Sequence, residues 1–375
     1  MTTTSAVAVP PGDILKDELE ARGWSQVEFA EILGASARLV SEILSAKRAI
    51  TPTTAKAIGA ALGTSAHVWL NLEAAHQLDK TSHDDTAVSR RSRLYQLAPI
   101  KEMIRRHWIE PSKDLDALER QIMKFFDTDS LDHEPQFQPY AAKTSVPWNS
   151  AQRAWLFRAR ALARTLQIKS KFTDTKHAEA IAKLKVLTHA PQEARHVSKI
   201  LPEAGIRFLL LEPLPQTKID GVCFWLSEHE PVVVVSLRYD RIDWFWQTLM
   251  HELVHVKSRH GLKEQPHIDI DILQQADERE KAVNAAAAAV LIDRAALDGF
   301  VSRVAPLYSK ERIQGFAARQ RIHPGIVVGQ LQHRGPEASG IPWTHSREML
   351  VPIRQHVAGT AITDGWGHVI ITPHE

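Results

Sequence analysis

The feature that most constrains this chain is the motif His251-Glu252-Leu253-Val254-His255, which lies inside an apolar run from Trp244 to Lys257. The run is typical of a helix, and residues four apart lie on one face of a helix, so both histidines are expected to point the same way. Two neutral imidazoles placed in this way can bind one zinc ion. Glu252 can then act as general base on a water molecule that the ion activates.

A tetrahedral catalytic zinc needs a third protein ligand. In one class of zinc enzymes this ligand is a histidine six residues after the second motif histidine. Here that position is Gly261, and His260 falls one residue short, so we exclude this arrangement. The arrangement that remains is a carboxylate on a following helix.

The pattern of residues 277–297 predicts that helix, and its first turns hold Glu278 and Glu280. Glu280 lies four residues before Asn284, so the two side chains share one helix face, and Asn284 can hydrogen-bond to a ligand imidazole. The small residues 285–289 would let this helix pack closely on the His-Glu helix. These features favour Glu280 as the third ligand, with Asn284 behind it.

Composition limits the other possibilities. The chain has 375 residues, which is enough for two or three domains, and 44% hydrophobic with 24% charged residues is typical of a globular protein. The formal net charge is only +2, so any nucleic-acid surface must be local. The single cysteine, Cys223, excludes an internal disulfide and a Cys-rich zinc site and fits a reducing cytosol. We see no signal peptide and no run long enough to span a membrane, and we predict a cytoplasmic protein.

Residues 12–80 predict a compact bundle of short helices. Ser25 is an N-cap with Glu28 three residues later, which is a capping box for a helix over 26–33. Gly34 ends that helix, and Ser36 caps the next one, which is expected to run to about residue 46. Two short helices joined in this way describe a helix-turn-helix.

This region resembles the Cro/C1-type (XRE) helix-turn-helix of HigA-like antitoxins. The stretches that carry the resemblance occur in order, at residues 12–15, 24–30, 33–36, 47–55 and 69–72. The resemblance implies that the second helix of the motif enters the major groove of double-stranded operator DNA. Carried over residue by residue, it implies two groups of contacts. Those facing bases would be Ser36, Arg38, Ser41 and Glu42, and those meeting phosphates would be Gln26, Lys47 and Arg48.

An alternative interpretation of the same region is a helical protein-interaction bundle that binds no DNA. Between residues 12 and 80, nine acidic residues outnumber seven basic ones. The positive surface expected of a DNA-binding protein is therefore confined to a patch. That patch would consist of Arg38, Lys47, Arg48 and Lys56.

The middle of the chain predicts helices over 94–126, followed by a loose stretch from 127 to 150. Residues 151–200 hold eleven Lys and Arg against three Asp and Glu, which indicates either a surface for DNA or an acidic partner, or a solvated helical face. Short strands are expected over 206–211, 222–226 and 232–236, with a turn at Asp220-Gly221. The His-Glu helix is expected to follow, capped by Asp240.

The rear of the chain, about 185–335, resembles the ImmA/IrrE family of metallo-endopeptidases. The residues that carry this resemblance are 204–206, 219–221, 231–236, 249–255, 280–285, 316–317 and 322–331. It implies a gluzincin-like domain with His251, His255 and Glu280 on Zn²⁺ and Glu252 as base. The chain departs from the family in having Ala-Ala after Asn284 and Leu-Ile-Asp at 291–293. The segment from about 100 to 170 also resembles the middle of larger regulators that fuse both modules.

We therefore predict an α+β, mostly helical protein, with an all-α helix-turn-helix domain and a zinc peptidase domain that contains a small sheet. The predicted segments are 1–80 for DNA binding, 81–184 as a helical middle region, 185–335 as the peptidase and 336–375 as an extension. The predicted function is a homodimeric transcriptional regulator that cleaves a partner repressor or itself. The alternative is a HigA-like antitoxin that binds operator DNA and a toxin, with a rear domain that does not cut. A peptide substrate is expected to add to strand 232–236, and Tyr239, His260 and His323 are candidates for stabilising an oxyanion.

Overall fold

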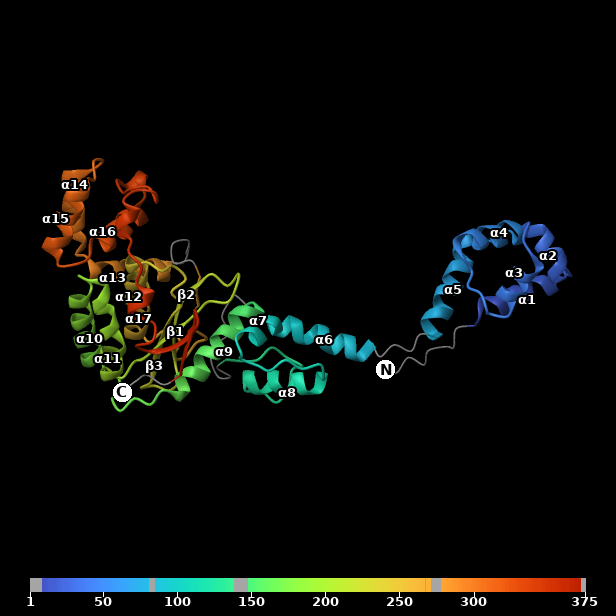
Figure 1. Cartoon of the computed structure of the whole chain (residues 1–375), viewed down its shortest axis with the longest axis horizontal. Coiled ribbons are helices and arrows are strands. Elements are labelled where there is room, and N and C mark those ends of the chain that lie inside the picture. Colours follow the sequence, from blue (N-terminus) through green and yellow to red (C-terminus); the bar gives the residue numbers. More distant parts are fainter. Residues whose placement is uncertain (1–8, 81–84, 138–147, 267, 271–277, 372–375) are drawn as a thin grey trace. The chain divides into compact units, whose positions relative to one another are not determined.

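The structure is a computed structural model that describes residues 9–80, 85–137, 148–266, 268–270 and 278–371. The chain divides into two units, Met1–Ser89 and Arg90–Glu375, and Figure 1 labels their elements. Among the described residues, no helix is long and apolar enough to cross a membrane.

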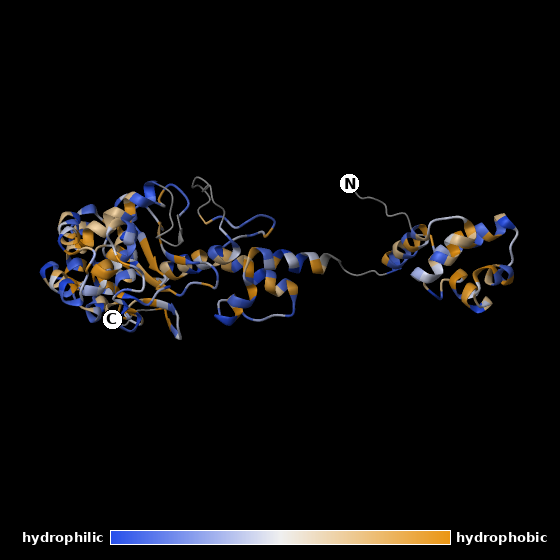
Figure 2. Cartoon of the chain, turned by 90° about the horizontal axis from the view of Figure 1, so that it is seen from above, coloured by the Kyte–Doolittle hydropathy of each residue, from blue (hydrophilic) through white to orange (hydrophobic). Residues whose placement is uncertain are grey.

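The first unit is a bundle of five helices up to residue 80, and their polar N-caps explain where several of them begin. They are α1 (Pro11–Arg22), α2 (Gln26–Leu33), α3 (Ala37–Leu44), α4 (Pro52–Leu62) and α5 (Ala66–Lys80). The capping box between Ser25 and Glu28 forms as predicted, and Ser36 caps α3, which ends two residues earlier than expected. Phe29, Ile58 and Trp69 are buried in its core, and in Figure 2 orange hydrophobic stretches alternate with blue hydrophilic ones along the helices.

The second unit holds the remaining helices and the sheet. α6 (Asp85–Leu97) begins before the boundary and continues into this unit, where it is followed by α7 (Ile100–Arg105), α8 (Leu115–Phe126), α9 (Ser150–Thr165), α10 (Asp174–Leu187) and α11 (Val197–Glu203). The later helices are α12 (Ile242–Lys257), α13 (Glu278–Leu291), α14 (Arg294–Val304), α15 (Lys310–Gln320), α16 (Pro324–Arg334) and α17 (Arg354–Val357). Short 3₁₀ helices lie at Pro191–His196, Pro336–Ala338 and Arg347–Met349. The division into four segments stays a prediction. The second unit contains residues of three of those segments, 81–184, 185–335 and 336–375.

A six-stranded mixed sheet runs through the second unit in the order β4-β2-β3-β1-β5-β6. Its strands are β1 (Arg207–Leu211), β2 (Ile219–Trp225), β3 (Pro231–Val235), β4 (Ile268–Ile270), β5 (Ile362–Gly365) and β6 (His368–Ile370). β1 is parallel to β3 and to β5, whereas β2 is antiparallel to β3 and to β4. Because β3 already pairs on both sides, the prediction that a peptide adds to strand 232–236 is wrong. The tail of the chain supplies β5, which the sequence pattern did not indicate.

Both faces of the sheet are covered, which explains why every residue of β1 and β3 is buried. Side chains alternate along a strand, so Phe208 and Leu210 join the core that contains α12, whereas Leu209 and Leu211 join the core that contains α9. α12, which carries the His-Glu motif, is thus held against one face of the sheet, and α9 lies against the other.

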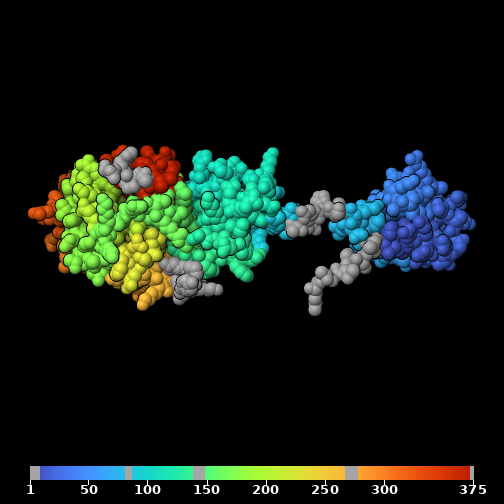
Figure 3. Space-filling view, turned by 90° about the horizontal axis from the view of Figure 1, so that it is seen from below, coloured from blue at the N-terminus to red at the C-terminus, as the bar shows by residue number. Residues whose placement is uncertain are grey.

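Within the basic stretch 151–200, α9 is less exposed than either predicted interpretation requires, whereas most of the later basic residues are exposed, among them Lys169, Lys183 and Lys199. Arg153 and Arg160 of α9 are buried, and Arg158 donates a hydrogen bond to Asp364 at 2.7 Å. Burial lowers the pKa of Arg160 to about 10. Neither a partner surface nor a solvated face therefore describes α9, whose arginines tie the middle region to the sheet. In the space-filling view (Figure 3), the surface of the middle helices adjoins that of α9.

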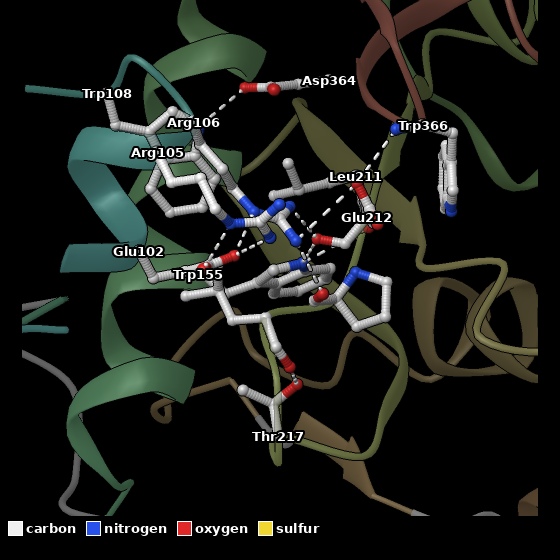
Figure 4. Close-up of polar contacts among 12 residues, drawn as sticks. Glu102, Arg105, Arg106, Trp108, Trp155, Leu211, Glu212, Thr217, Asp364 and Trp366 are labelled. Atoms are coloured by element: carbon white, nitrogen blue, oxygen red, sulfur yellow. Dashed lines mark hydrogen bonds and ion pairs between the residues drawn. The ribbon is translucent and has the colours of Figure 1, made fainter.

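A polar cluster at the end of β1 joins the middle region to the tail (Figure 4). Arg106, just after α7, donates to the carbonyl oxygens of Glu212 and Pro213 at 2.9 and 3.0 Å. Glu212 in turn accepts from the backbone N–H of Trp366 at 2.9 Å. On the other side, the indole N–H of Trp108 donates to Asp364 of β5 at 3.1 Å. Segments far apart in the sequence are thus fixed at one end of the sheet.

Removing the Asp364 carboxylate should destabilise the second unit. Asp364→Ala leaves the buried indole N–H of Trp108 and the partly buried guanidinium of Arg158 without this acceptor, which should lower the free energy of unfolding by about 2 to 4 kcal/mol. Urea unfolding followed by tryptophan fluorescence measures the loss. Asp116→Ala, which breaks an exposed pair with Arg90, is the matched control and should cost about 0 to 1 kcal/mol. Equal losses in the two variants would contradict the argument.

Candidate metal centre

The helix that carries the motif is buried along most of its length. α12 begins at Ile242, and its exposure is 0% at His251, 0% at Glu252 and 3% at His255. The predicted cap at Asp240 is wrong, because the N-cap is Arg241 and makes no side-chain cap. Asp240 instead accepts from the backbone N–H groups of residues 353 and 354 at 2.8 and 2.7 Å. This contact fixes the chain that leads into α17.

Three predicted ligands converge at the contact between α12 and α13. The Nε2 atoms of His251 and His255 are 2.9 Å apart, and Glu280 Oε2 lies 3.4 and 3.3 Å from them. Glu280 is 2% exposed. Glu278, the alternative in the sequence, is exposed and pairs with Lys281. One helix face therefore supplies both imidazoles, and the facing helix supplies the carboxylate.

The outer nitrogen of each imidazole has a hydrogen-bond partner. His251 Nδ1 lies 2.9 Å from the side-chain oxygen of Asn284, which accepts the N–H. His255 Nδ1 lies 2.8 Å from Nδ1 of His260. Burial, followed by the neighbouring His255, lowers the pKa of His260 to about 4, so this ring is neutral at pH 7 and can accept. With both Nδ1 atoms protonated, the two Nε2 atoms present lone pairs to each other.

Such a donor set fits a zinc ion. Two lone pairs at 2.9 Å repel each other unless a cation lies between them, and a carboxylate oxygen completes the set, with all three atoms within 4.8 Å of one another. The separations between these atoms suit neighbouring ligands on one ion with bonds of about 2.0–2.2 Å. Asn284 and His260 are the kind of partners that fix the tautomer of a ligand histidine.

Glu252 is held by the close approach of β2. A Cβ atom built on Gly221 would lie 2.3 Å from Glu252 Oε1 and 3.0 Å from Cγ2 of Thr248. Any side chain at this position would therefore displace the carboxylate. The prediction of a turn at Asp220-Gly221 is wrong, because both residues are buried inside β2. The glycine serves close packing of strand on helix instead.

His260 is a hydrogen-bond partner of His255, a role that the sequence pattern did not indicate. The chain reverses after α12, because Arg259 and Gly261 on either side of His260 have φ of 55° and 74°. This turn directs the ring of His260 towards His255. His323, a candidate for stabilising an oxyanion, instead caps α16 by accepting from the N–H of Gly325 at 3.0 Å. Tyr239 packs against Trp244, with their rings 4.5 Å apart.

The residues predicted to contact DNA lie on α3 and around it. Ser36 uses its hydroxyl oxygen to cap α3, while Arg38 and Ser41 are exposed on the helix. Gln26 at the start of α2 is exposed, and so are Lys47 and Arg48 after α3. These positions stay predictions, since no nucleic acid is part of this structure.

Glu42 organises the positive patch. It accepts a hydrogen bond from Arg38 Nε at 2.8 Å and another from Arg48 Nη1 at 3.3 Å. The hydrogen bond to Arg38 lowers the pKa of Glu42, so its carboxyl group is ionised at neutral pH. Glu42 therefore neutralises part of the charge that two of the predicted DNA contacts carry.

Comparison with known proteins matches the two units separately. The Helix-turn-helix family matches residues 15–69, and the IrrE N-terminal-like domain, a peptidase family, matches residues 203–311. The uncharacterized HTH-type transcriptional regulator YddM of Escherichia coli (strain K12) is 35% identical over 68 residues, which are 18% of this chain and 72% of that protein.

Solved structures also match the first unit. An addiction module antidote protein of the HigA family from Coxiella burnetii is 32% identical, covering 20% of this chain and 83% of its own, with a TM-score of 0.20. PA4674 in complex with its operator DNA, from Pseudomonas aeruginosa, is 30% identical, covering 28% and 99%, with a TM-score of 0.19. The chain belongs to the XRE-type helix-turn-helix regulators and carries an IrrE-like peptidase domain behind the DNA-binding domain.

Removing the partner of His255 should weaken metal binding. His260→Ala leaves His255 Nδ1 without its acceptor, so we expect zinc affinity to fall about 10- to 100-fold. Titration of the full-length protein against a zinc chelator measures this change. His260→Asn, which restores an acceptor, should recover part of the affinity.

His323→Ala is the matched control for this experiment. His323 caps a helix of the same unit, so its loss should lower thermal stability and leave zinc affinity unchanged. Zinc affinity that is equal in His260→Ala and wild type would show that His255 does not depend on His260.

Proposed function

We propose that this protein is a cytoplasmic, DNA-binding transcriptional regulator whose second unit is a zinc-dependent endopeptidase that cleaves a partner repressor or the chain itself. The observation that carries the proposal is the complete donor set of His251, His255 and Glu280, with Glu252 fully buried beside it. A domain that served only as a scaffold would not need an ionisable cluster buried at this cost. The match to a peptidase family supports the same conclusion.

Each residue of the cluster has a distinct role in this proposal. His251, His255 and Glu280 hold the zinc ion, and Asn284 and His260 orient the two imidazoles through the bonds described above. Bound zinc supplies Lewis-acid polarisation of the substrate carbonyl and lowers the pKa of a water molecule. Glu252 would accept a proton from the attacking water at a carboxylate oxygen and would pass it to the leaving amine. Gly221 keeps that carboxylate in place against β2.

The first unit is the part of the chain that binds DNA in this proposal. We propose that α3 enters the major groove, with Ser36, Arg38, Ser41 and Glu42 towards bases. Gln26, Lys47 and Arg48 would contact phosphates. A homodimer follows from this proposal, because helix-turn-helix proteins read paired half-sites. The E. coli relative is described as a transcriptional regulator, which supports this assignment.

The peptidase proposal predicts that Glu252→Gln keeps zinc and loses proteolysis. The amide cannot accept the proton, so cleavage should fall by about 100-fold or more. Mass spectrometry of newly formed protein N-termini, in cells that produce wild type or Glu252→Gln, identifies the cleaved proteins. Wild type alone should generate a set of new termini in a repressor or in this chain.

Two further variants distinguish the proposed zinc ligand Glu280 from the nearby Glu278. Glu280→Gln should lose both zinc and cleavage, whereas Glu278→Gln, on the exposed side of the same turn, should retain both. If wild type and Glu252→Gln give the same set of N-termini, the peptidase proposal fails, and DNA binding alone remains as the function.

The DNA-binding proposal predicts opposite effects for two neighbouring residues. Lys47→Ala removes a phosphate contact, so it should weaken binding to any duplex and reduce the salt slope by about 1. Glu42→Gln removes the carboxylate that holds Arg38 and Arg48, so it should strengthen binding to duplex of random sequence. Fluorescence anisotropy at several salt concentrations measures both. Wild type that binds no duplex at low salt would overturn the proposal.

A further inference from the structure

A cleft of about 370 Å³ begins one helical turn from the metal centre, at Gln247 and Thr248 of α12. It continues along α13 from Ala285, the residue that follows Asn284. The two helices run in opposite directions, because His255 contacts Glu280 whereas Gln247 donates to the carbonyl oxygen of Asn284 at 3.5 Å. The cleft therefore lies along the same contact between α12 and α13 as the metal ligands, one helical turn away from them.

The walls of this cleft are mainly apolar. Ala288 of α13 and Ile292, just after that helix, line the cleft together with Leu297 of α14 and Ile326 of α16, and short alanine side chains leave the space open. An engineered cavity of about 150 Å³ holds a benzene molecule. A cleft of about 370 Å³ is therefore larger than one aromatic side chain needs and suits several consecutive residues of a peptide.

Thr248 gives the cleft a polar group at its inner end. The residue is 1% exposed, and its hydroxyl oxygen has no hydrogen-bond partner among the described residues. The methyl group of Thr248 packs against Gly221, so the hydroxyl occupies the other branch of a side chain that lines the cleft. A threonine in a helix commonly bonds to the carbonyl one turn earlier, and this one is available for a peptide group instead.

The far end of the cleft is positively charged. Arg294 and Arg334 both line it, and both pair with the same carboxylate, that of Asp298. The side chain of Arg294 is 82% exposed and lies 3.9 Å from Asp298. Two guanidinium groups that share one carboxylate leave a net positive charge, which attracts an acidic side chain.

Helix geometry sets the spacing between the two ends. Asn284 lies seven residues before the end of α13 at Leu291, which is roughly 10 Å at about 1.5 Å per residue, and Arg294 begins α14 just beyond that end. An extended peptide advances about 3.3 Å per residue, so roughly three residues reach the end of α13 and a fourth reaches the level of Arg294.

We propose that the cleft binds a substrate peptide that has a large apolar residue next to the bond to be cut and an acidic residue about four positions further along. This inference rests on the proposed peptidase function and specifies its substrate class. The apolar side chain lies between Ala288 and Ile326, and the acidic side chain pairs with Arg294 and Arg334. The backbone of the peptide contacts Thr248 as it leaves the metal centre.

Binding of labelled peptides to the full-length, zinc-loaded Glu252→Gln protein tests the inference without cleavage. Fluorescence anisotropy compares octapeptides that have Phe or Ala at the apolar position and Glu or Lys four residues away. In one series the charged residue follows the apolar residue, and in a second series it precedes it. In one of the two series, the peptide with Phe and Glu should bind at least 10-fold more tightly than those with Ala or Lys. Equal binding of all the peptides, or no binding, overturns the inference.

Variants of the cleft locate the binding. Ala288→Trp fills the apolar part and should abolish the preference for Phe, and Ala288→Leu should weaken it in a protein with less altered packing. Arg294→Glu should reverse the preference from Glu to Lys at the distant position. Arg303→Glu changes the same charge on the same helix outside the cleft and should leave both preferences unchanged. Preferences that survive in Ala288→Trp and Arg294→Glu place the binding elsewhere and overturn the inference.

Cleavage by the wild type separates this inference from the proposed function. If wild type cuts the peptides without regard to Phe or Glu, the peptidase proposal stands and the inference fails. If Glu252→Gln binds with the expected preferences but wild type cuts none of the peptides, the cleft is a peptide-binding site and the peptidase proposal fails.

Discussion

The contact between α12 and α13 is the constraint on which the second unit depends. It brings two imidazole nitrogens to 2.9 Å from each other and puts the Glu280 carboxylate against both. A cluster of this kind is costly to bury unless a cation balances it. The sheet therefore has to hold α12 rigidly, and it does so with a fully buried β3 on one side of β2 and with Gly221 packed directly on Glu252. The metal centre and the core of the second unit are parts of one packing arrangement.

Much of this arrangement follows from local sequence rules. The two helices of the helix-turn-helix could be predicted to within two residues, because Ser25 and Ser36 are strong N-caps and Gly34 ends the helix that it follows. Glu280 and Asn284 could be predicted because spacing by four places both on one helix face, and the structure brings both to the imidazoles of α12.

Other features depend on contacts between distant segments, which local patterns do not encode. Asp220-Gly221 predicts a turn in isolation, and only the approach of α12 explains a glycine inside a buried strand. His260 lies one residue too close to His255 in sequence to be a ligand in the expected pattern. Two neighbouring residues with positive φ reverse the chain, so that His260 forms a hydrogen bond with His255 instead. β5 is short and contains Asp364, whose charge is balanced by Arg158 from a helix about 200 residues earlier.

Contacts between distant segments also make the tail and the middle region part of the body that carries the metal centre. Trp108, Arg158 and Asp364 connect three segments of the chain through buried hydrogen bonds, and Asp240 ties the start of α12 to residues 353 and 354. Displacement of the tail would leave buried donors without acceptors at one end of the sheet and would release the chain that precedes α12. Because α12 carries both histidines and Glu252, such a change would alter the metal centre itself. Residues 336–371 are thus part of the support of the metal centre, although none of them is among the donors described above.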